Sequence, residues 1–139
     1  MKILLLVLMI FMHLISDFTL QGILAQFKQK KYWKENYPDE KYANDWKISL
    51  FLHSLWWSIS IILPPMMFMI CFMGFPTEVR DCISVMLFIS IWINTAIHMF
   101  VDDLKCNKLR INLVVDQLIH MVQIIATFAE CITIMNIFS

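Results

Sequence analysis

Long apolar stretches separated by shorter polar segments make up most of this chain. Four stretches, roughly 3–27, 48–73, 82–104 and 112–138, are long enough or nearly long enough to cross a bilayer as helices. A helix is expected because it satisfies its own backbone hydrogen bonds within hydrocarbon. We therefore predict an all-α fold, an integral membrane four-helix bundle that forms a single transmembrane domain over residues 1–139.

The polar connections differ in positive charge, and this difference predicts the orientation. The first connection, about 28–47, contains six lysines, and the third contains Lys105, Lys108 and Arg110. The second contains one basic residue, Arg80. Because Lys and Arg accumulate in cytoplasmic loops, we expect both termini to be non-cytoplasmic.

Local signals refine this outline. The first connection mixes its charges with Tyr32, Trp33 and Tyr37, a composition typical of a short interfacial helix or an aromatic belt at the headgroups. The pair Pro64–Pro65 should kink or interrupt the second span about halfway across.

The composition supports the membrane class and excludes several functions. The 139 residues are 60% hydrophobic with a mean hydropathy of +0.69, which is too apolar for a soluble domain of this size. The formal net charge is zero, so no basic field favours nucleic acid as a partner. The chain has two glycines, too few for a glycine-rich phosphate loop, and its four cysteines lack metal-binding spacing.

The histidines are the most informative residues. All four fall inside the predicted spans, and three of them stand four residues from an aspartate. The sets are His13 with Asp17, His98 with Asp102, Asp116 with His120, and the lone His53. Residues four apart share a helix face, so each pair can aim two side chains at one point. Three aspartates in hydrocarbon would cost at most roughly 8–10 kcal/mol, a burden that favours pairing or metal coordination.

The orientation predicts that these groups share one layer. With a rise of 1.5 Å per residue, His53 and the pairs of the third and fourth spans lie roughly 5–15 Å below the cytoplasmic surface. The first pair joins this layer if the first helix tilts, or if it ends near Gly22 and leaves 23–31 as a separate interfacial piece. We favour the second arrangement because Gly commonly terminates helices.

Imidazole and carboxylate groups without thiolate are ligands for zinc, manganese and iron ions. We predict a divalent metal site, with zinc expected first and manganese or iron as alternatives. Its ligands would be His13, Asp17, His53, His98, Asp102, Asp116 and His120. This set exceeds one zinc site and suits two ions about 3.5–4 Å apart, or one ion with a general base and residues that orient the ligands.

Asp102, Asp116 and Lys105 are the predicted catalytic residues. Lys105 either meets an anionic substrate or extends to the headgroups. Gln21 and Gln117 either orient ligands or face the membrane surface, and both alternatives stay open. Glu130 is left out of the site, since it lies about 15 Å of helix rise from His120.

The run His13-Leu-Ile-Ser-Asp17-Phe-Thr-Leu-Gln21, the His98-x3-Asp102-x2-Lys105 element and the Asp116-Gln117-x2-His120 element resemble one family. This family comprises the bacterial and phage membrane proteins called domain of unknown function 3307. The resemblance covers nearly the whole chain and implies a small polytopic protein of a bacterial inner membrane with a shared His/Asp set. It implies no activity.

Three classes of function fit these residues. The first is a metal-dependent hydrolase acting on a phosphoester, such as a lipid or polyprenyl headgroup, at the cytoplasmic leaflet. The second is a non-enzymatic membrane module, such as a phage interference factor or an assembly subunit, with a structural His/Asp cluster. The third is a proton or metal-ion transporter, which the apolar outer halves of the spans disfavour. Membrane lipids are the expected partners, and a thin four-helix bundle is compatible with a homo-oligomer or a membrane partner protein.

Overall fold

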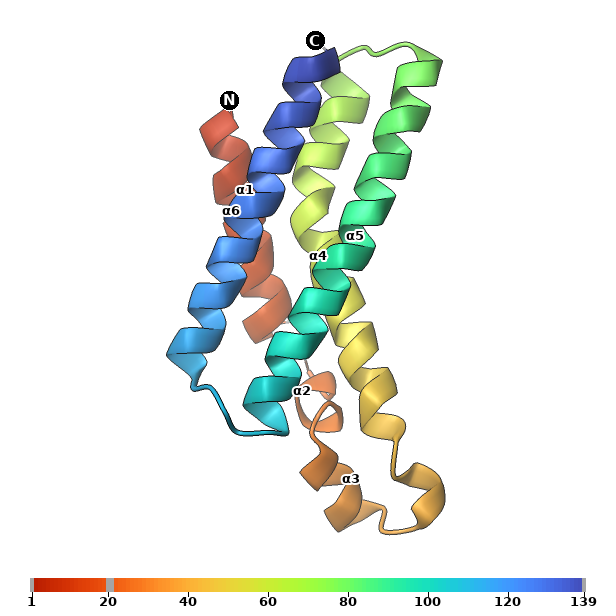
Figure 1. The fold of residues 1–139 in the computed structure, drawn as a ribbon, viewed down its shortest axis with the longest axis vertical. Coiled ribbons are helices and arrows are strands. Elements are labelled where there is room, and N and C mark those ends of the chain that lie inside the picture. Colours follow the sequence, from red (N-terminus) through yellow and green to blue (C-terminus); the bar gives the residue numbers. More distant parts are fainter. Residues whose placement is uncertain (1, 20–21, 139) are drawn as a thin grey trace.

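The computed structural model describes residues 2–19 and 22–138, which form helices and loops with no strand among them. In this part of the chain, four segments are long and apolar enough to cross a membrane. They are Lys2–Thr19, Glu40–Phe72, Thr77–Cys106 and Leu113–Phe138. These segments run alongside one another as a bundle (Figure 1). The predicted all-α membrane bundle is therefore confirmed.

The first span is shorter than the predicted 3–27. It consists of α1 (Lys2–Leu14) and a π-helical turn, η1 (Ile15–Thr19). Gly22 has a φ of 48°, in the left-handed region that residues with a Cβ rarely adopt, and a short helix α2 (Leu24–Phe27) follows. The favoured arrangement, with the span ending before a separate short piece, is confirmed.

The first connection contains α3 (Lys30–Asn36) and a 3₁₀ turn, η2 (Glu40–Tyr42). The indole N–H of Trp33 donates to the carbonyl of Phe27 at 2.6 Å and ties α3 back onto α2. The rings of Phe27, Trp33 and Tyr37 cluster at centroid separations of 5.2 to 5.3 Å. The predicted short helix is thus present, while its position among lipid headgroups stays a prediction.

The second span, α4 (Asp45–Phe72), contains Pro64 and Pro65 within a continuous helix. The prolines do not interrupt it, but its ribbon changes direction near the middle of its length (Figure 1). Each proline removes one backbone donor and crowds the preceding turn, which accounts for a bend. The helix ends just before Gly74, which has a φ of 61°.

The last two spans are α5 (Thr77–Cys106) and α6 (Leu113–Phe138). We predicted that α5 would begin near residue 82, but it begins directly after Pro76, with Glu78 in its first turn. Pro just before a helix and an acidic first turn both favour this start, so most of the predicted second loop is helical. At the start of α6, the side chain of Asn112 accepts the backbone N–H of Val115 at 2.9 Å.

Figure 1 shows both ends of the chain at one end of the bundle, together with the α4–α5 turn. We call this the terminal end. At the opposite end, which we call the loop end, lie α2, α3 and the connection between α5 and α6 (Figure 1). The even number of crossings agrees with the predicted topology, and which end faces the cytoplasm stays a prediction.

The interior divides into an apolar part and a polar part. Apolar side chains such as Ile61, Met69 and Ile134, each at most 1% exposed, form the core along α4 and α6. Large apolar side chains such as Ile3 and Val122 are 78% and 66% exposed on the outside, as expected where lipid replaces water. The buried histidines and aspartates lie nearer the loop end, so the fold places a polar layer inside an apolar shell.

Candidate metal centre

Six of the seven predicted ligands meet in one buried layer, and each is at most 6% exposed. They are Asp17 from η1, His53 from α4, His98 and Asp102 from α5, and Asp116 and His120 from α6. Residues from four separate spans therefore converge on one region, as predicted from their similar depth in the membrane.

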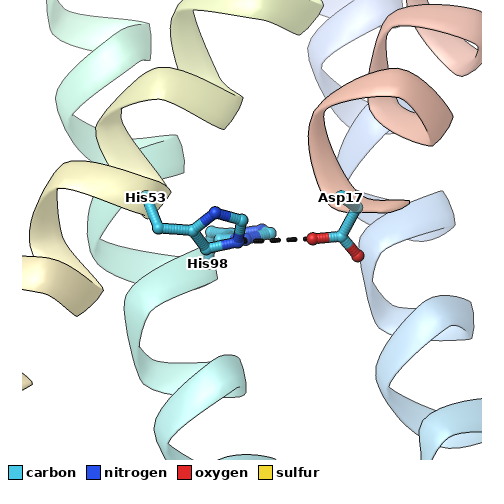
Figure 2. A group of neighbouring side chains, drawn as sticks. All are labelled: Asp17, His53 and His98. Carbon is cyan, nitrogen blue, oxygen red and sulfur yellow. Dashed lines mark hydrogen bonds and ion pairs between the residues drawn. The ribbon is translucent and has the colours of Figure 1, made fainter. Parts of the chain in front are cut away.

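One part of the layer is the group formed by Asp17, His53 and His98 (Figure 2). The Nε2 atom of His53 lies 3.3 Å from Oδ1 of Asp17 and 3.2 Å from Nε2 of His98. One ligand-type atom from each of these residues lies within 4.8 Å of the others. Three spans thus bring an oxygen and two imidazole nitrogens to one place.

In both Asp102 and Asp116, one carboxylate oxygen binds a lysine and the other faces His120. In each residue, Oδ2 accepts a hydrogen bond from a lysine: Lys28 reaches Asp102 at 2.6 Å, and Lys105 reaches Asp116 at 2.7 Å. In each residue, Oδ1 faces Nε2 of His120, at 3.8 Å from Asp102 and 3.4 Å from Asp116. His120 therefore lies between two carboxylates whose outer oxygens are held by cations.

The atoms at the centre of this arrangement are buried and make no hydrogen bond with the described residues, although both carboxylate oxygens lie 3.4 to 3.8 Å from the imidazole nitrogen. They are Oδ1 of Asp102, Oδ1 of Asp116 and Nε2 of His120. The imidazole of His120 stacks on that of His98, with ring centroids 4.1 Å apart, and His98 stacks on Trp57 at 4.2 Å. This stacking fixes the planes of both imidazoles and directs their Nε2 atoms at the carboxylates.

His13 lies beside the layer. It is not among the described residues whose ligand-type atoms lie within 4.8 Å of one another in groups of three. Its Nδ1 accepts the indole N–H of Trp57 at 2.8 Å, so its Nε2 carries the proton and donates to Oε1 of Gln117 at 3.0 Å. The amide nitrogen of Gln117 then donates to Asp17 at 2.9 Å and to Asp116 at 3.0 Å. His13 is therefore placed to orient two carboxylates through Gln117.

The π-helical turn explains why the first His/Asp pair behaves differently from the other two. An α-helical turn would superpose residues four apart, but η1 begins at Ile15 and widens the turn. As a result His13 and Asp17 meet on Gln117 rather than at one point. Gln21, which the sequence pairs with Asp17, lies outside the described residues.

Lys28 is the main residue that sequence reasoning did not place in the site. It is 3% exposed, and its backbone carbonyl accepts the side-chain amide of Asn107 at 3.2 Å. Asn107 also accepts the backbone N–H of Lys30 at 2.7 Å, which ties the loop-end segment to the end of α5. The sequence signal was a lysine just after a Gly-terminated span, but its partner Asp102 lies 74 residues away.

The formal charges of this layer nearly balance. Three carboxylates, from Asp17, Asp102 and Asp116, face two ammonium groups, from Lys28 and Lys105, which leaves one negative charge when the imidazoles are neutral. Lys105 is the part of this set nearest the outside, since its side chain is 25% exposed while that of Asp116 is 0% exposed.

A second polar set extends from this layer toward the terminal end, where we expected apolar packing apart from Glu130. The side-chain oxygen of Asn94 accepts Gln123 at 2.9 Å and Thr127 at 3.1 Å. Ser90 donates to Glu130 at 2.8 Å. The prediction that the outer halves of the spans are apolar apart from Glu130 is therefore wrong. This feature no longer disfavours a transporter.

None of the family models, curated proteins or solved structures compared with the chain matches it. The resemblance to domain of unknown function 3307 therefore stays a prediction.

The donor set fits a divalent metal ion. Imidazole nitrogens and carboxylate oxygens are the ligands that zinc, manganese and iron accept in proteins. Three groups of three such atoms occur here, and each shares a residue with another group. Nε2 of His120 and the facing Oδ1 atoms of Asp102 and Asp116 approach to 3.4 and 3.8 Å without forming a hydrogen bond, and coordination to a cation would satisfy such atoms.

Proposed function

We propose that this protein is a membrane-embedded, metal-dependent hydrolase that acts on a phosphoester of a lipid or polyprenyl headgroup. The observation that carries the proposal is the set of overlapping groups of buried imidazole nitrogens and carboxylate oxygens, in each of which the ligand atoms lie within 4.8 Å of one another. Oδ1 of Asp102, Oδ1 of Asp116 and Nε2 of His120 make no hydrogen bond with the described residues, and such buried atoms need an explanation. Coordination to divalent cations supplies one.

The described residues form three candidate groups of ligand atoms, and these groups overlap. Asp17, His53 and His98 would hold one ion. A second ion would lie beside His120, with either His98 and Asp102 or Asp17 and Asp116. When bound, such ions supply Lewis acidity toward a phosphoryl oxygen and make water a stronger acid. We expect zinc first, with manganese or iron as alternatives.

The chain's own residues supply the remaining chemistry. Lys105 lies at the edge of the layer, so we assign it to the phosphate, whose negative charge would compete with Asp116 for its ammonium group. Asp116 would then accept the proton of the attacking water at Oδ2, the oxygen that Lys105 releases. The water oxygen forms a bond to phosphorus while the bond from phosphorus to the alcohol oxygen breaks, and Asp116 passes the proton to the departing alcohol oxygen.

The proposal includes a location. The loop end carries most of the basic residues of the connections, which favours its placement at the cytoplasmic face. With that orientation the reacting centre lies just beneath the cytoplasmic headgroups, where a lipid phosphate resides. We propose a bacterial inner membrane as the site, on the strength of the family resemblance alone.

Release of inorganic phosphate tests this function. Purified protein is reconstituted into vesicles that contain phosphatidic acid or a polyprenyl monophosphate, with zinc or manganese added. We expect metal-dependent release that falls at least 100-fold in Asp116→Asn, since the general base contributes about 10²–10⁴-fold.

Lys108→Met is the matched control for Lys105→Met. Lys108 pairs with Asp103 at 2.8 Å on the surface, with its side chain 48% exposed, so its loss should leave the rate unchanged. Lys105→Met should instead raise KM, because it removes the cation assigned to the phosphate. Equal rates for both lysine variants would contradict the role given to Lys105.

A further inference from the structure

A groove of about 320 Å³ lies between α5 and α6, on the terminal-end side of the His/Asp layer. Its walls include Ile93, Val122 and Ala126, and the first two are 55% and 66% exposed on the outside of the bundle. In a membrane this face meets lipid. The groove is therefore open to molecules dissolved in the bilayer, and its volume is in the range of small-ligand sites.

The groove also has polar lining residues, and their hydrogen bonds are not complete. The amide nitrogen of Gln123 donates to the backbone carbonyl of Asn94 at 2.8 Å and to its side-chain oxygen at 2.9 Å. This pairing fixes the orientation of the Gln123 amide and turns its Oε1 away from Asn94. Gln123 is 7% exposed, and its Oε1 is buried and has no hydrogen-bond partner among the described residues, so a hydroxyl in the groove reaches it only when the side chain shifts toward the groove.

We propose that this groove binds a hydroxyl-bearing amphiphile from the membrane, with the hydroxyl donating to Oε1 of Gln123 and the hydrocarbon chain lying against the apolar walls. A mostly apolar groove with a few fixed polar atoms is the usual form of a site for such a ligand. Leaving a buried acceptor without a donor is costly, and one hydroxyl removes that cost.

A neutral donor fits better than an ammonium group. The polar residues around Gln123 are the uncharged Asn94 and Thr127, and the carboxylate that lines the groove, Glu130, is two helical turns further along α6. A cation at Gln123 would lose its water without a counter-charge beside it, whereas a hydroxyl needs one acceptor. Glu130 already accepts the hydroxyl of Ser90 at 2.8 Å.

A pair of ligands that differ in one hydrogen-bond donor tests the proposal. The protein is purified in an amine-oxide detergent without hydroxyl groups, and binding of 1-dodecanol and of dodecyl methyl ether is measured by native mass spectrometry. Both have the same hydrocarbon chain, but only the alcohol donates. We expect the alcohol to bind the wild-type protein saturably and about tenfold more tightly than the ether.

Variants assign the preference to this groove. Gln123→Leu should bind alcohol and ether equally, while Thr133→Val should keep the tenfold preference, because Thr133 is exposed on α6 and its hydroxyl donates to its own helix at 2.8 Å. Equal binding of the two ligands by the wild type would overturn the proposal, and that comparison needs no variant to fold. So would an unchanged preference in Gln123→Leu.

Discussion

The ion pair between Lys28 and Asp102 offers the sharpest test of how the polar layer is held together. The two side chains are 4% and 0% exposed and meet at 2.6 Å. In Lys28→Met the apolar stem is kept and the ammonium group is lost. Asp102 would then be a buried carboxylate without its cation, and removal of one partner from such a pair costs about 3–5 kcal/mol.

Lys31→Met is the matched control. Lys31 lies in the same segment and pairs with Glu35 at 3.7 Å, but the two side chains are 77% and 60% exposed. Exposed pairs of this kind contribute less than about 0.5 kcal/mol. The difference between the two variants therefore measures burial, since the chemical change is the same.

The assay is the free energy of unfolding in a reversible SDS titration, followed by far-ultraviolet circular dichroism. We expect Lys28→Met to lose about 3–5 kcal/mol without metal, and metal at 100 times its Kd to return about 2.7 kcal/mol. At one fixed metal concentration, metal should stabilise the variant more than the wild type, because loss of the Lys28 ammonium group leaves the layer more negative and favours a cation. A loss as small as that of Lys31→Met would refute the buried ion pair.

Three further predictions concern the neighbours of the site. Trp57→Phe removes the N–H that His13 accepts and should weaken metal binding about 10–100-fold, as loss of ligand-orienting groups does, whereas an unchanged metal affinity by isothermal titration would contradict that role. Gly22→Ala should lower the free energy of unfolding by about 1 kcal/mol, because its φ of 48° is strained for a residue with a Cβ; an equal or higher value in the SDS titration would argue against this conformation. Proteoliposomes should show no flux of zinc or manganese, and flux abolished by Asn94→Leu would replace the hydrolase with a transporter.

Much of the fold follows from the sequence because each span is a local signal. An apolar run of sufficient length predicts a helix wherever its neighbours lie, and Gly22 marks the end of the first span correctly. The start of α5 was predicted five residues late, because the hydropathy pattern placed Glu78 and Arg80 in a loop. Pro76, just before the helix, was also a local signal, but the hydropathy pattern was given more weight.

The site was less predictable, because its geometry depends on contacts between spans. The spacing of His98 with Asp102 anticipated their common direction along α5, but the π-helical turn at η1 has no such pattern and sends His13 to Trp57 instead. Lys28 was missed because an ion pair with a residue on another span leaves no mark in local sequence. The polar set around Asn94 was missed for the same reason, because the contacts of Asn94 with Gln123 and Thr127 join two different spans.

The central claim is that the buried His/Asp layer holds a divalent metal ion with His120 among its ligands, and the metal content of the purified protein tests it most directly. The protein is expressed with zinc and manganese in the medium and measured by elemental mass spectrometry beside His120→Ala and the control Thr133→Val. The account predicts one or two equivalents of metal per chain in the wild type and the control, and at least one equivalent fewer in His120→Ala. Metal below a tenth of an equivalent in the wild type, even after reconstitution, or equal metal in all three proteins, would contradict it.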